Sequence, residues 1–374
     1  MLGDILRCII CKARGYCGRP FCPILQKINK KFKCSDLLEN LPNVDMDFFG
    51  SNVSFFVGRW GYPNVKISPL ITDIPKDVEH LFGYNLAEII KIRINLLSPS
   101  VAANVNKRTT IIEKLQELAM SKEGVDTEVE FYKKPKLSLS FVDNLPPMGP
   151  YGELKRISYD NPKIPKIVDK VADDYSFEGV LRIYEKFDEI YASRLFSAGI
   201  LGRKKKLVPT RWAITAVDDM IGKYLIKKIR EYKILEEPLM FETSYLGNEF
   251  RIYFLPSAWA FELIEIYNKC VWNPTNKPIT VSDYEIKERK TYAKNTGGAY
   301  YAARLAVLEK LDEMRRQAKV IVKRVVNEEY SVPLGVWVIR EAVRDALRKR
   351  PKKLDNVEKI GTISSQKLLD DFIK

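Results

Sequence analysis

The stretch Val53-Ser-Phe-Phe-Val-Gly-Arg-Trp-Gly-Tyr-Pro-Asn-Val-Lys-Ile67 places two runs of β-branched and aromatic residues on either side of a turn that contains glycine and proline. The runs are typical of strands and the glycine and proline of turns, so the stretch predicts strands at 53–57 and 65–67. Further along, apolar residues recur at helical spacing over 85–97 and 109–120, and residues 137–142 alternate like a strand. The first half of the chain therefore mixes both element types.

The second half continues this mixture without a repeat of fixed period. The patterns predict helices at 164–172, 179–197, 221–232, 299–326 and 338–348, and strands at 207–216 and 250–255. Strands and helices interleaved in both halves indicate an α+β fold, with a mixed α/β body.

Changes of composition divide the chain into four predicted parts. A break rich in proline and glycine lies at 146–152, and a polar run without a sustained period begins after Arg350. The predicted parts are a small zinc module at 1–36, an N-terminal α/β part of the body at 37–150, a C-terminal α/β part at 151–350 and a flexible tail at 351–374.

The charge balance of the chain indicates what kind of partner it binds. The chain has 374 residues, and its 62 Lys and Arg against 48 Asp and Glu give a formal net charge of +14. Clustered cations gain affinity for a phosphate backbone by releasing condensed counterions, so the surplus favours a nucleic acid, with charge spread over a solvated surface as the alternative. His80 is the only histidine, which excludes mechanisms that need two histidines in one subunit, such as HExxH zinc hydrolysis.

The beginning of the sequence, Met-Leu-Gly-Asp-Ile-Leu-Arg-Cys8, has no basic segment followed by an apolar run of signal-peptide length. No stretch approaches the roughly 18 apolar residues of a membrane span. We therefore expect a cytoplasmic, nucleoid-associated protein without a membrane partner.

Five of the six cysteines lie within the first 34 residues, and four of them form the pattern C-x2-C-x5-C-x4-C with Cys8, Cys11, Cys17 and Cys22. In a reducing compartment such a cluster favours metal binding, and four thiolates can close a tetrahedral site around a structural zinc ion. An iron–sulfur cluster, a redox thiol set and simple burial are the alternatives, and Cys34 is an alternative ligand in place of Cys22.

The last nine residues are Gln366-Lys-Leu-Leu-Asp-Asp-Phe-Ile-Lys374. A single helical turn would place Leu369, Phe372 and Ile373 on one side, with Gln366 at the edge. An apolar tip at the end of a polar tether implies a groove on a partner. The spacing Q-x-x-h-x-x-a-a resembles the box by which replication and repair proteins dock on the sliding clamp PCNA, although Ile373 replaces the second aromatic residue that is common there.

A basic segment flanked by glycine is the predicted nucleic-acid contact of the body. Its cations favour phosphate, and its tryptophan can stack on a base; the alternative is a solvated turn before a buried strand. The candidate residues are Arg203, Lys204, Lys205, Lys206, Arg211 and Trp212.

Two carboxylates and one arginine are the candidate catalytic residues. Asp218 and Asp219 follow the predicted strand 207–216, where a pair could hold a divalent metal ion for phosphodiester hydrolysis or could instead cap the next helix. Glu262 is a further candidate ligand. Arg59, flanked by aromatic residues in a tight turn, could grip phosphate or pin its loop by pairing with a carboxylate.

Several segments resemble the Nre family of archaeal DNA repair proteins over the whole chain. They are Cys8-Ile-Ile-Cys11, Cys17-Gly-Arg-Pro-Phe-Cys22, Phe56-Val-Gly-Arg-Trp-Gly-Tyr-Pro63 and Leu207-Val-Pro-Thr-Arg-Trp-Ala-Ile-Thr-Ala-Val-Asp-Asp219. The resemblance implies a role in DNA damage repair, with the cysteine module as a C4-type zinc finger and the tail as a PCNA-interacting motif. It implies no particular reaction.

These observations favour a DNA repair protein that binds DNA and is recruited to PCNA by its tail. Three alternatives remain open: a non-enzymatic adaptor for other repair proteins, a metal-dependent nuclease, and an RNA-binding zinc protein, since a basic surface and a zinc knuckle serve RNA equally well.

Overall fold

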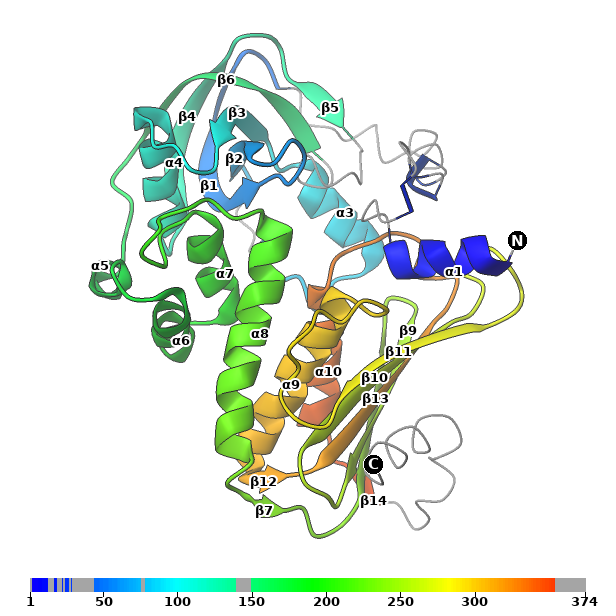
Figure 1. Ribbon diagram of the computed structural model, residues 1–374. Helices are drawn as coiled ribbons and strands as arrows, with labels where there is room; N and C mark the ends of the chain where they lie inside the picture. Colours follow the sequence, from blue (N-terminus) through cyan, green and yellow to red (C-terminus); the bar gives the residue numbers. More distant parts are fainter. Residues whose placement is uncertain are drawn as a thin grey trace. The chain divides into compact units, whose positions relative to one another are not determined.

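The computed structural model describes residues 2–12, 17–18, 22, 24–26, 28, 44–74, 78–138 and 149–353. Contacts within the chain group it into an N-terminal unit, residues 13–221, and a C-terminal unit, residues 1–12 with 222–374 (Figure 1). The structure has 34% helix and 29% strand, so the predicted mixed α/β class is confirmed. The four-part division expected from the sequence uses other boundaries and stays a prediction.

The described part of the N-terminal unit contains a six-stranded sheet with the order β3-β2-β1-β4-β6-β5. Its strands are β1 (Asp47–Val57), β2 (Asn64–Thr72), β3 (Ser98–Asn104), β4 (Val125–Phe131), β5 (Lys136–Ser138) and β6 (Gly149–Tyr159). Neighbouring strands are antiparallel, and β3 also pairs with β6 in parallel. The additional pairing closes β1, β2, β3, β6 and β4 into a ring.

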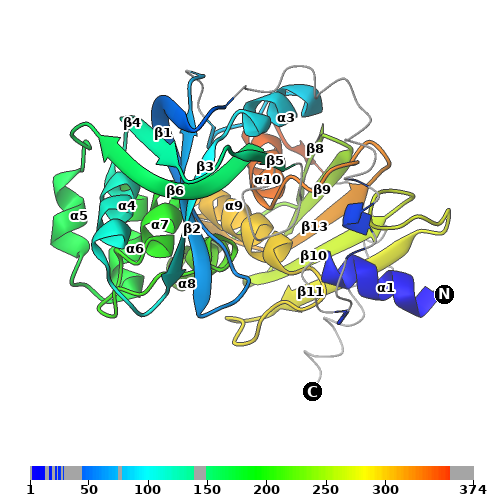
Figure 2. The same ribbon diagram turned by 90° about the horizontal axis from the view of Figure 1, so that it is seen from above.

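This ring has the topology of an OB-type barrel. Five strands close in the order β1-β2-β3-β6-β4, the β3–β6 pair is parallel, and helix α4 (Thr110–Met120) connects β3 to β4. Strand β1 pairs with β4 through its first half and with β2 through its second, and its register with β2 shifts between Asn52 and Ser54. Such a bulge bends a strand around a barrel. Figure 2 shows β6 as a strongly bent strand of the same barrel.

Alternating side chains explain why the barrel forms. Val125, Val129 and Phe131 of β4 are buried, and the acidic residues between them lie on the outer face. Helix α4 adds Ile112, Leu115 and Leu118 to the same hydrophobic core. The apolar face of each element therefore lies inside the barrel.

The described part of the N-terminal unit also contains helices α3 (Leu86–Ile94), α5 (Lys166–Val171), α6 (Ser176–Lys186) and α7 (Glu189–Ser197). Arg194 of α7 fixes this helix to the barrel, because its guanidinium donates to the carbonyl oxygens of Val53 at 3.2 Å and Ser121 at 2.9 Å. The loop that joins α7 to helix α8 (Thr210–Ile229) is thereby held beside the barrel.

The described part of the C-terminal unit contains a second six-stranded sheet, ordered β11-β10-β13-β9-β8-β14, in which only the β10–β13 pair is parallel. Its strands are β8 (Leu239–Tyr245), β9 (Asn248–Leu255), β10 (Ala260–Tyr267), β11 (Ile279–Glu285), β13 (Lys319–Val326) and β14 (Lys352–Lys353). Two short strands, β7 (Lys233–Ile234) and β12 (Arg316–Gln317), form a separate pair.

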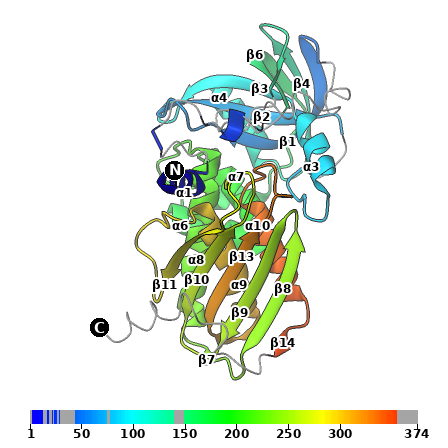
Figure 3. The ribbon, with the colours of Figure 1, turned by 90° about the vertical axis from the view of Figure 1, so that its right-hand side faces the viewer.

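The described part of the C-terminal unit also contains helices α1 (Leu2–Cys11), α9 (Gly298–Met314) and α10 (Trp337–Arg348). Helices α9 and α10 cover one face of the sheet (Figure 3). Phe261 of β10 meets Tyr300 of α9 edge to face, with ring centroids 5.0 Å apart, and Phe250, Ile252 and Phe254 of β9 are buried on the same side. Among the described residues, no helix is both long and apolar enough to cross a membrane.

Three of the predicted elements are wrong. The predicted helix 179–197 is two helices, because α6 ends at Lys186 and Asp188 caps the start of α7. Residues 207–216 do not form a strand, because helix α8 (Thr210–Ile229) begins within them and continues through the predicted helix 221–232. The predicted helix 299–326 ends at Met314, where Arg315 adopts a left-handed conformation with φ 53°, and the rest of it forms β12 and β13. Most of residues 23–43 and the tail after Lys353 lie outside the described residues.

Candidate nucleic-acid interface

Three loops of the N-terminal unit are joined into one surface by backbone hydrogen bonds. The Val105 amide donates to the Pro63 carbonyl at 2.9 Å, which links the β3–α4 loop to the β1–β2 loop. The Leu207 amide donates to the Val105 carbonyl at 3.2 Å, which adds the α7–α8 loop. We define the three-loop surface as residues 58–66, 104–109 and 198–212, so it includes the loops and the strand and helix ends that flank them.

Glycine is required at the tight turns of this surface. Gly61 has φ +77°, and a Cβ there would lie 2.6 Å from the Asn64 carbonyl oxygen. Gly199 has φ +72°, and a Cβ there would lie 2.8 Å from the Lys206 carbonyl carbon. Both positions combine a backbone conformation that favours glycine with no room for a side chain. The turns therefore hold their loops in defined positions.

The three-loop surface is strongly basic. Its segments contain no Asp or Glu, and nine of the chain's Lys and Arg residues lie in them. They are Arg59, Lys66, Lys107, Arg108, Arg203, Lys204, Lys205, Lys206 and Arg211. Five of these are exposed and four are half-buried. Clustered charge of one sign attracts a polyanion to this face.

Three aromatic side chains emerge from the same surface. Trp60 is 46% exposed, Tyr62 43% and Trp212 45%. The rings of Tyr62 and Trp212, which come from the β1–β2 loop and the start of α8, contact each other with centroids 5.3 Å apart. The surface therefore combines exposed rings of the kind that stack on bases with positive charge.

Cations brace two of these rings and also the ring of Tyr175, which lies outside the three segments. The guanidinium carbon of Arg59 lies 4.8 Å from the Trp60 ring centroid, and Lys206 Nζ lies 5.7 Å from that of Tyr62. Arg203 lies 3.8 Å from the ring of Tyr175, which is 59% exposed, and donates to its hydroxyl at 2.9 Å. Each cation partly occupies one face of its ring by a cation–π contact.

Two helices begin at the three-loop surface. Helix α4 starts after Thr109, whose side chain accepts the Ile112 amide at 3.4 Å, and α8 starts at Thr210. Thr210 also joins this helix to the barrel, because its Oγ1 accepts the Val57 amide at 2.8 Å. The positive ends of both helix dipoles therefore add to the positive charge of the side chains.

The structure brings the predicted basic segment together with the predicted turn around Arg59. The residues from Arg203 to Lys206 lie in the α7–α8 loop, Arg211 and Trp212 lie in the first turn of α8, and Arg59 lies in the β1–β2 loop. The sequence interpretation missed the contribution of Lys66, Lys107 and Arg108. The absence of acidic residues from their segments was visible, but the contact between the loops depends on the fold.

The structure corrects the interpretation of the candidate carboxylates. Asp218 and Asp219 do not follow a strand; they lie in the middle of helix α8. Adjacent residues of a helix project about 100° apart, so the geometry of a pair at the end of a strand does not apply. Asp218 is fully buried, and Glu262 belongs to the C-terminal unit. Among the described residues, no group of three or more His, Cys, Asp or Glu side chains is arranged to hold a metal ion.

All four predicted zinc ligands belong to the described residues, but there they do not form a group arranged to hold a metal ion. Helix α1 contains Cys8 and Cys11 one turn apart, with Cys11 buried and Cys8 half-buried. Cys17 and Cys22 are half-buried, and Cys270 is buried. Cys34 and the clamp-box residues Gln366, Leu369, Phe372 and Ile373 lie outside the described residues.

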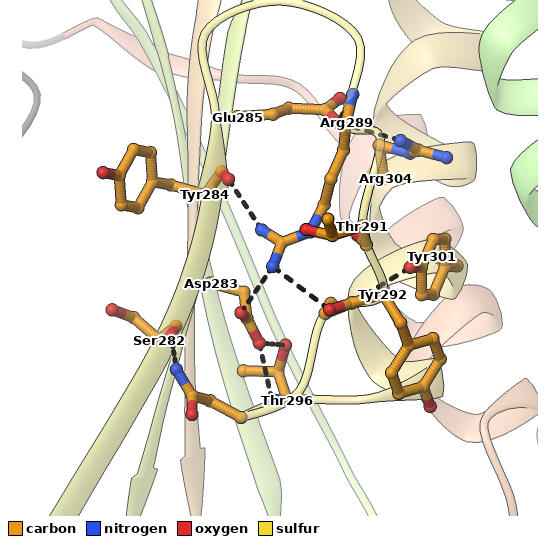
Figure 4. A network of polar contacts seen from close by, with 12 residues as sticks. Ser282, Asp283, Tyr284, Glu285, Arg289, Thr291, Tyr292, Thr296, Tyr301 and Arg304 are labelled. Carbon is orange, nitrogen blue, oxygen red and sulfur yellow. Dashed lines mark hydrogen bonds and ion pairs between the residues drawn. The ribbon is translucent and has the colours of Figure 1, made fainter. Parts of the chain in front are cut away.

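A network of polar contacts covers the outer edge of the second sheet (Figure 4). Arg289 donates to the Tyr284 carbonyl at 2.8 Å and to Asp283 at 3.0 Å, and Asn295 donates to the Ser282 carbonyl at 2.8 Å. Thr296 donates to Asp283 through its amide at 2.7 Å and its hydroxyl at 2.8 Å. These side chains satisfy the carbonyl groups of edge strand β11, so the network protects the edge of the sheet.

Buried charges continue from this network across the sheet. Arg304 pairs with Glu285 at 2.9 Å; burial raises the pKa of Glu285, and the guanidinium of Arg304 opposes this. Glu265 pairs with Lys12 and Arg324, and Arg324 also donates to Asn248 at 2.6 and 2.9 Å. These carboxylates are held by cations, which indicates a structural role for the cluster in the C-terminal unit.

Comparison with known proteins identifies the family of the chain. Residues 16–273 match the family model described as "Archaeal Nre, N-terminal", and residues 284–371 match "Archaeal Nre, C-terminal". The DNA repair protein NreA of Archaeoglobus fulgidus is 36% identical, over 97% of this chain and 94% of its own length. The DNA repair protein NreB of the same organism is 34% identical, over 94% and 90%.

A relative from another archaeon agrees with this result. The DNA repair protein NreA of Haloferax volcanii is 33% identical, over 83% of this chain and 80% of its own length. No solved structure matches the chain. The identities and coverage show that the chain belongs to the archaeal Nre family.

Proposed function

We propose that this chain is a DNA repair protein that binds DNA through the three-loop surface and is recruited to the PCNA sliding clamp by its C-terminal motif. The observation that carries DNA binding is the contact between Tyr62, Trp212 and Lys206 on an exposed face without acidic residues in its segments. Relatives over nearly the whole chain are named DNA repair proteins, which supports the role in repair.

The position of this surface on the barrel supports the same proposal. OB-type barrels bind oligonucleotides over the face of strands β2 and β3 and the loops beside it, including the loop between the first two strands. Here that loop carries Arg59, Trp60 and Tyr62, and Lys66 and Ala102 lie opposite each other on β2 and β3, both exposed. A fold alone does not fix a function, so the proposal rests on these side chains.

Removal of two exposed cations tests the electrostatic part of the proposal. The double variant Lys107→Ala/Lys204→Ala is expected to bind DNA several-fold more weakly at moderate salt. It should also make the slope of log affinity against log salt concentration shallower by about 1.5. The reason is that a protein with two fewer phosphate contacts releases fewer counterions when it binds. Fluorescence anisotropy with a labelled oligonucleotide at four or more salt concentrations measures both quantities.

The control is a double variant at two exposed lysines of the C-terminal unit, Lys233→Ala/Lys277→Ala, which changes the net charge by the same amount. An equal loss of affinity and slope in the control would mean that total charge, and not the three-loop surface, determines binding.

We also propose that Cys8, Cys11, Cys17 and Cys22 hold a structural zinc ion. Cys8 and Cys11 are one turn apart on α1, so their thiols lie on the same side of the helix, and thiolates are ligands that zinc prefers. A tetrathiolate site leaves no open coordination position, so the ion would stabilise the N-terminal segment and take no part in a reaction.

The zinc proposal predicts about one zinc ion per chain in protein purified without chelator, measured by inductively coupled plasma mass spectrometry. Cys17→Ser should lose most of this metal, because three thiolates hold zinc less tightly. Cys270→Ser is the matched control, since this buried thiol lies outside the module. Retained zinc in Cys22→Ser together with lost zinc in Cys34→Ser would assign the fourth ligand to Cys34 in place of Cys22, and protein without zinc would refute the proposal.

A further inference from the structure

We propose that the three-loop surface binds an unpaired DNA strand and stacks its bases on Trp60, Tyr62 and Trp212. This inference rests on the proposed function and adds the form of DNA that the surface recognises. It depends on the exposure of the three rings and on the cations beside them. Electrostatic attraction to DNA alone would not require these rings.

The exposed faces of the rings are the first argument. Phosphate binding needs cations only, and nine cations would serve it without an aromatic side chain. Trp60, Tyr62 and Trp212 nevertheless leave between 43% and 46% of their surface in water. The face of a base is the part of DNA that gains most from covering an aromatic ring, and stacking of this kind is worth roughly 1–3 kcal/mol per base.

The bracing cations are the second argument. Arg59 lies over Trp60 and Lys206 lies over Tyr62, so one face of each ring is occupied and the ring is held in place. A base that stacks on the opposite face meets a ring that has already lost its rotational freedom. The same cations lie where the phosphates next to a stacked base would pass.

The layout of the α7–α8 loop is the third argument. Arg203 contacts Tyr175, and Lys206, three residues later, contacts Tyr62. The basic run therefore lies between two exposed aromatic groups. Aromatic rings on both sides of a line of cations match a strand whose bases and phosphates alternate along its length. A duplex offers phosphates but encloses the faces of its bases within the stack, so it cannot use these rings.

The test compares ligands of equal length by fluorescence anisotropy at one salt concentration. The probes are labelled dT15, a 15-base-pair duplex and a 15-unit strand of abasic residues, which keeps the phosphates and lacks the bases. The full-length protein should bind dT15 at least tenfold more tightly than either of the others. Equal affinity for dT15 and the abasic strand would overturn the stacking proposal, and equal affinity for the duplex would overturn the preference for single strands.

Substitutions assign the preference to the rings. Tyr62→Ala and Trp212→Ala should each weaken dT15 binding about tenfold while leaving the affinity for the abasic strand unchanged. Trp212→Phe should recover most of the loss. Phe49→Ala is the matched control, since Phe49 is a 66% exposed aromatic residue on β1 that faces the acidic Glu128 of β4. An unchanged dT15 affinity in both ring variants would refute the assignment.

Two outcomes separate this inference from the proposed function. Binding to all three probes with similar affinity would leave DNA binding intact and remove base stacking. No binding to any probe at low salt would remove the proposed function itself. An rU15 strand bound more tightly than dT15 would assign the surface to RNA, because only the 2′-hydroxyl and the base differ between these ligands.

Discussion

Deletion of residues 366–374 is expected to abolish the heat of binding to the cognate sliding clamp in isothermal titration calorimetry. The segment contains the spacing of Gln366, Leu369, Phe372 and Ile373 that resembles the clamp-binding box. An aromatic side chain that fills a pocket at the centre of such an interface dominates its affinity, so Phe372→Ala alone should weaken binding at least thirtyfold. The unfolding transition should stay unchanged in both variants, because the sequence predicts a polar tether whose apolar tip has no core of its own to fill.

The departure from the usual box supplies the opposite test. Ile373 stands where a second aromatic residue is common, so Ile373→Phe should tighten clamp binding through a larger buried surface. Lys374→Ala, one residue further, is the control and should change little. Clamp affinity that survives the deletion would place the contact elsewhere in the chain and remove the argument from the tail.

Local sequence patterns correctly predict the elements whose boundaries depend on residues that are close in the sequence. Residues 109–120 carry an N-cap threonine and an apolar face of period 3.6, and helix α4 occupies Thr110–Met120. Helix α10 and strand β9 were found in the same way. In each of these elements, the residues that set its ends and its buried face lie within the element or next to it in the sequence.

The wrong elements show where local patterns fail. Residues 319–326 are rich in β-branched side chains, but the helical pattern before them continues through Arg315, where no glycine marks the end of the helix. Strand β13 forms because it pairs with β10 and β9, which precede it by more than fifty residues. The barrel closes in the same non-local way, through the β3–β6 pair. The three-loop surface depends on this closure, so only its separate basic segments could be predicted.

Removal of the carboxylate at position 265 is expected to have the largest effect on stability. Glu265 is fully buried between Lys12 and Arg324, with nitrogen to oxygen distances of 2.5 Å to each. Glu265→Ala would leave the buried Arg324 and the half-buried Lys12 without this counter-charge, and loss of one partner of a buried pair costs about 3–5 kcal/mol in comparable cases. Urea unfolding followed by the fluorescence of Trp259 and Trp272, both buried in the C-terminal unit, measures this loss as a lower midpoint.

The control separates charge burial from ordinary ion pairing. Glu123→Ala removes an exposed partner of Lys163 and should leave the midpoint unchanged within error. Replacement of Lys12, Glu265 and Arg324 together by methionine should recover part of the loss, because none of these three positions then holds an unpaired charge. If the triple variant is less stable than Glu265→Ala, the stability lost on removal of Glu265 comes from the hydrogen bonds of the cluster and not from the unpaired charge.

The pH dependence of unfolding shows whether the ionised carboxylate of Glu265 stabilises the fold. Burial alone raises the pKa of Glu265, but Lys12 and Arg324 outweigh this and hold the pKa below its ordinary value. Because the pKa is lower in the folded state than in the unfolded state, the ionised carboxylate stabilises the fold at neutral pH. This stabilisation should decline as the pH falls from the ordinary glutamate pKa, about 4.3, through the folded value. In the methionine triple variant, this part of the acid-induced loss of unfolding free energy should be absent. If that variant and the natural protein lose stability identically as the pH falls, Glu265 does not contribute to the pH dependence.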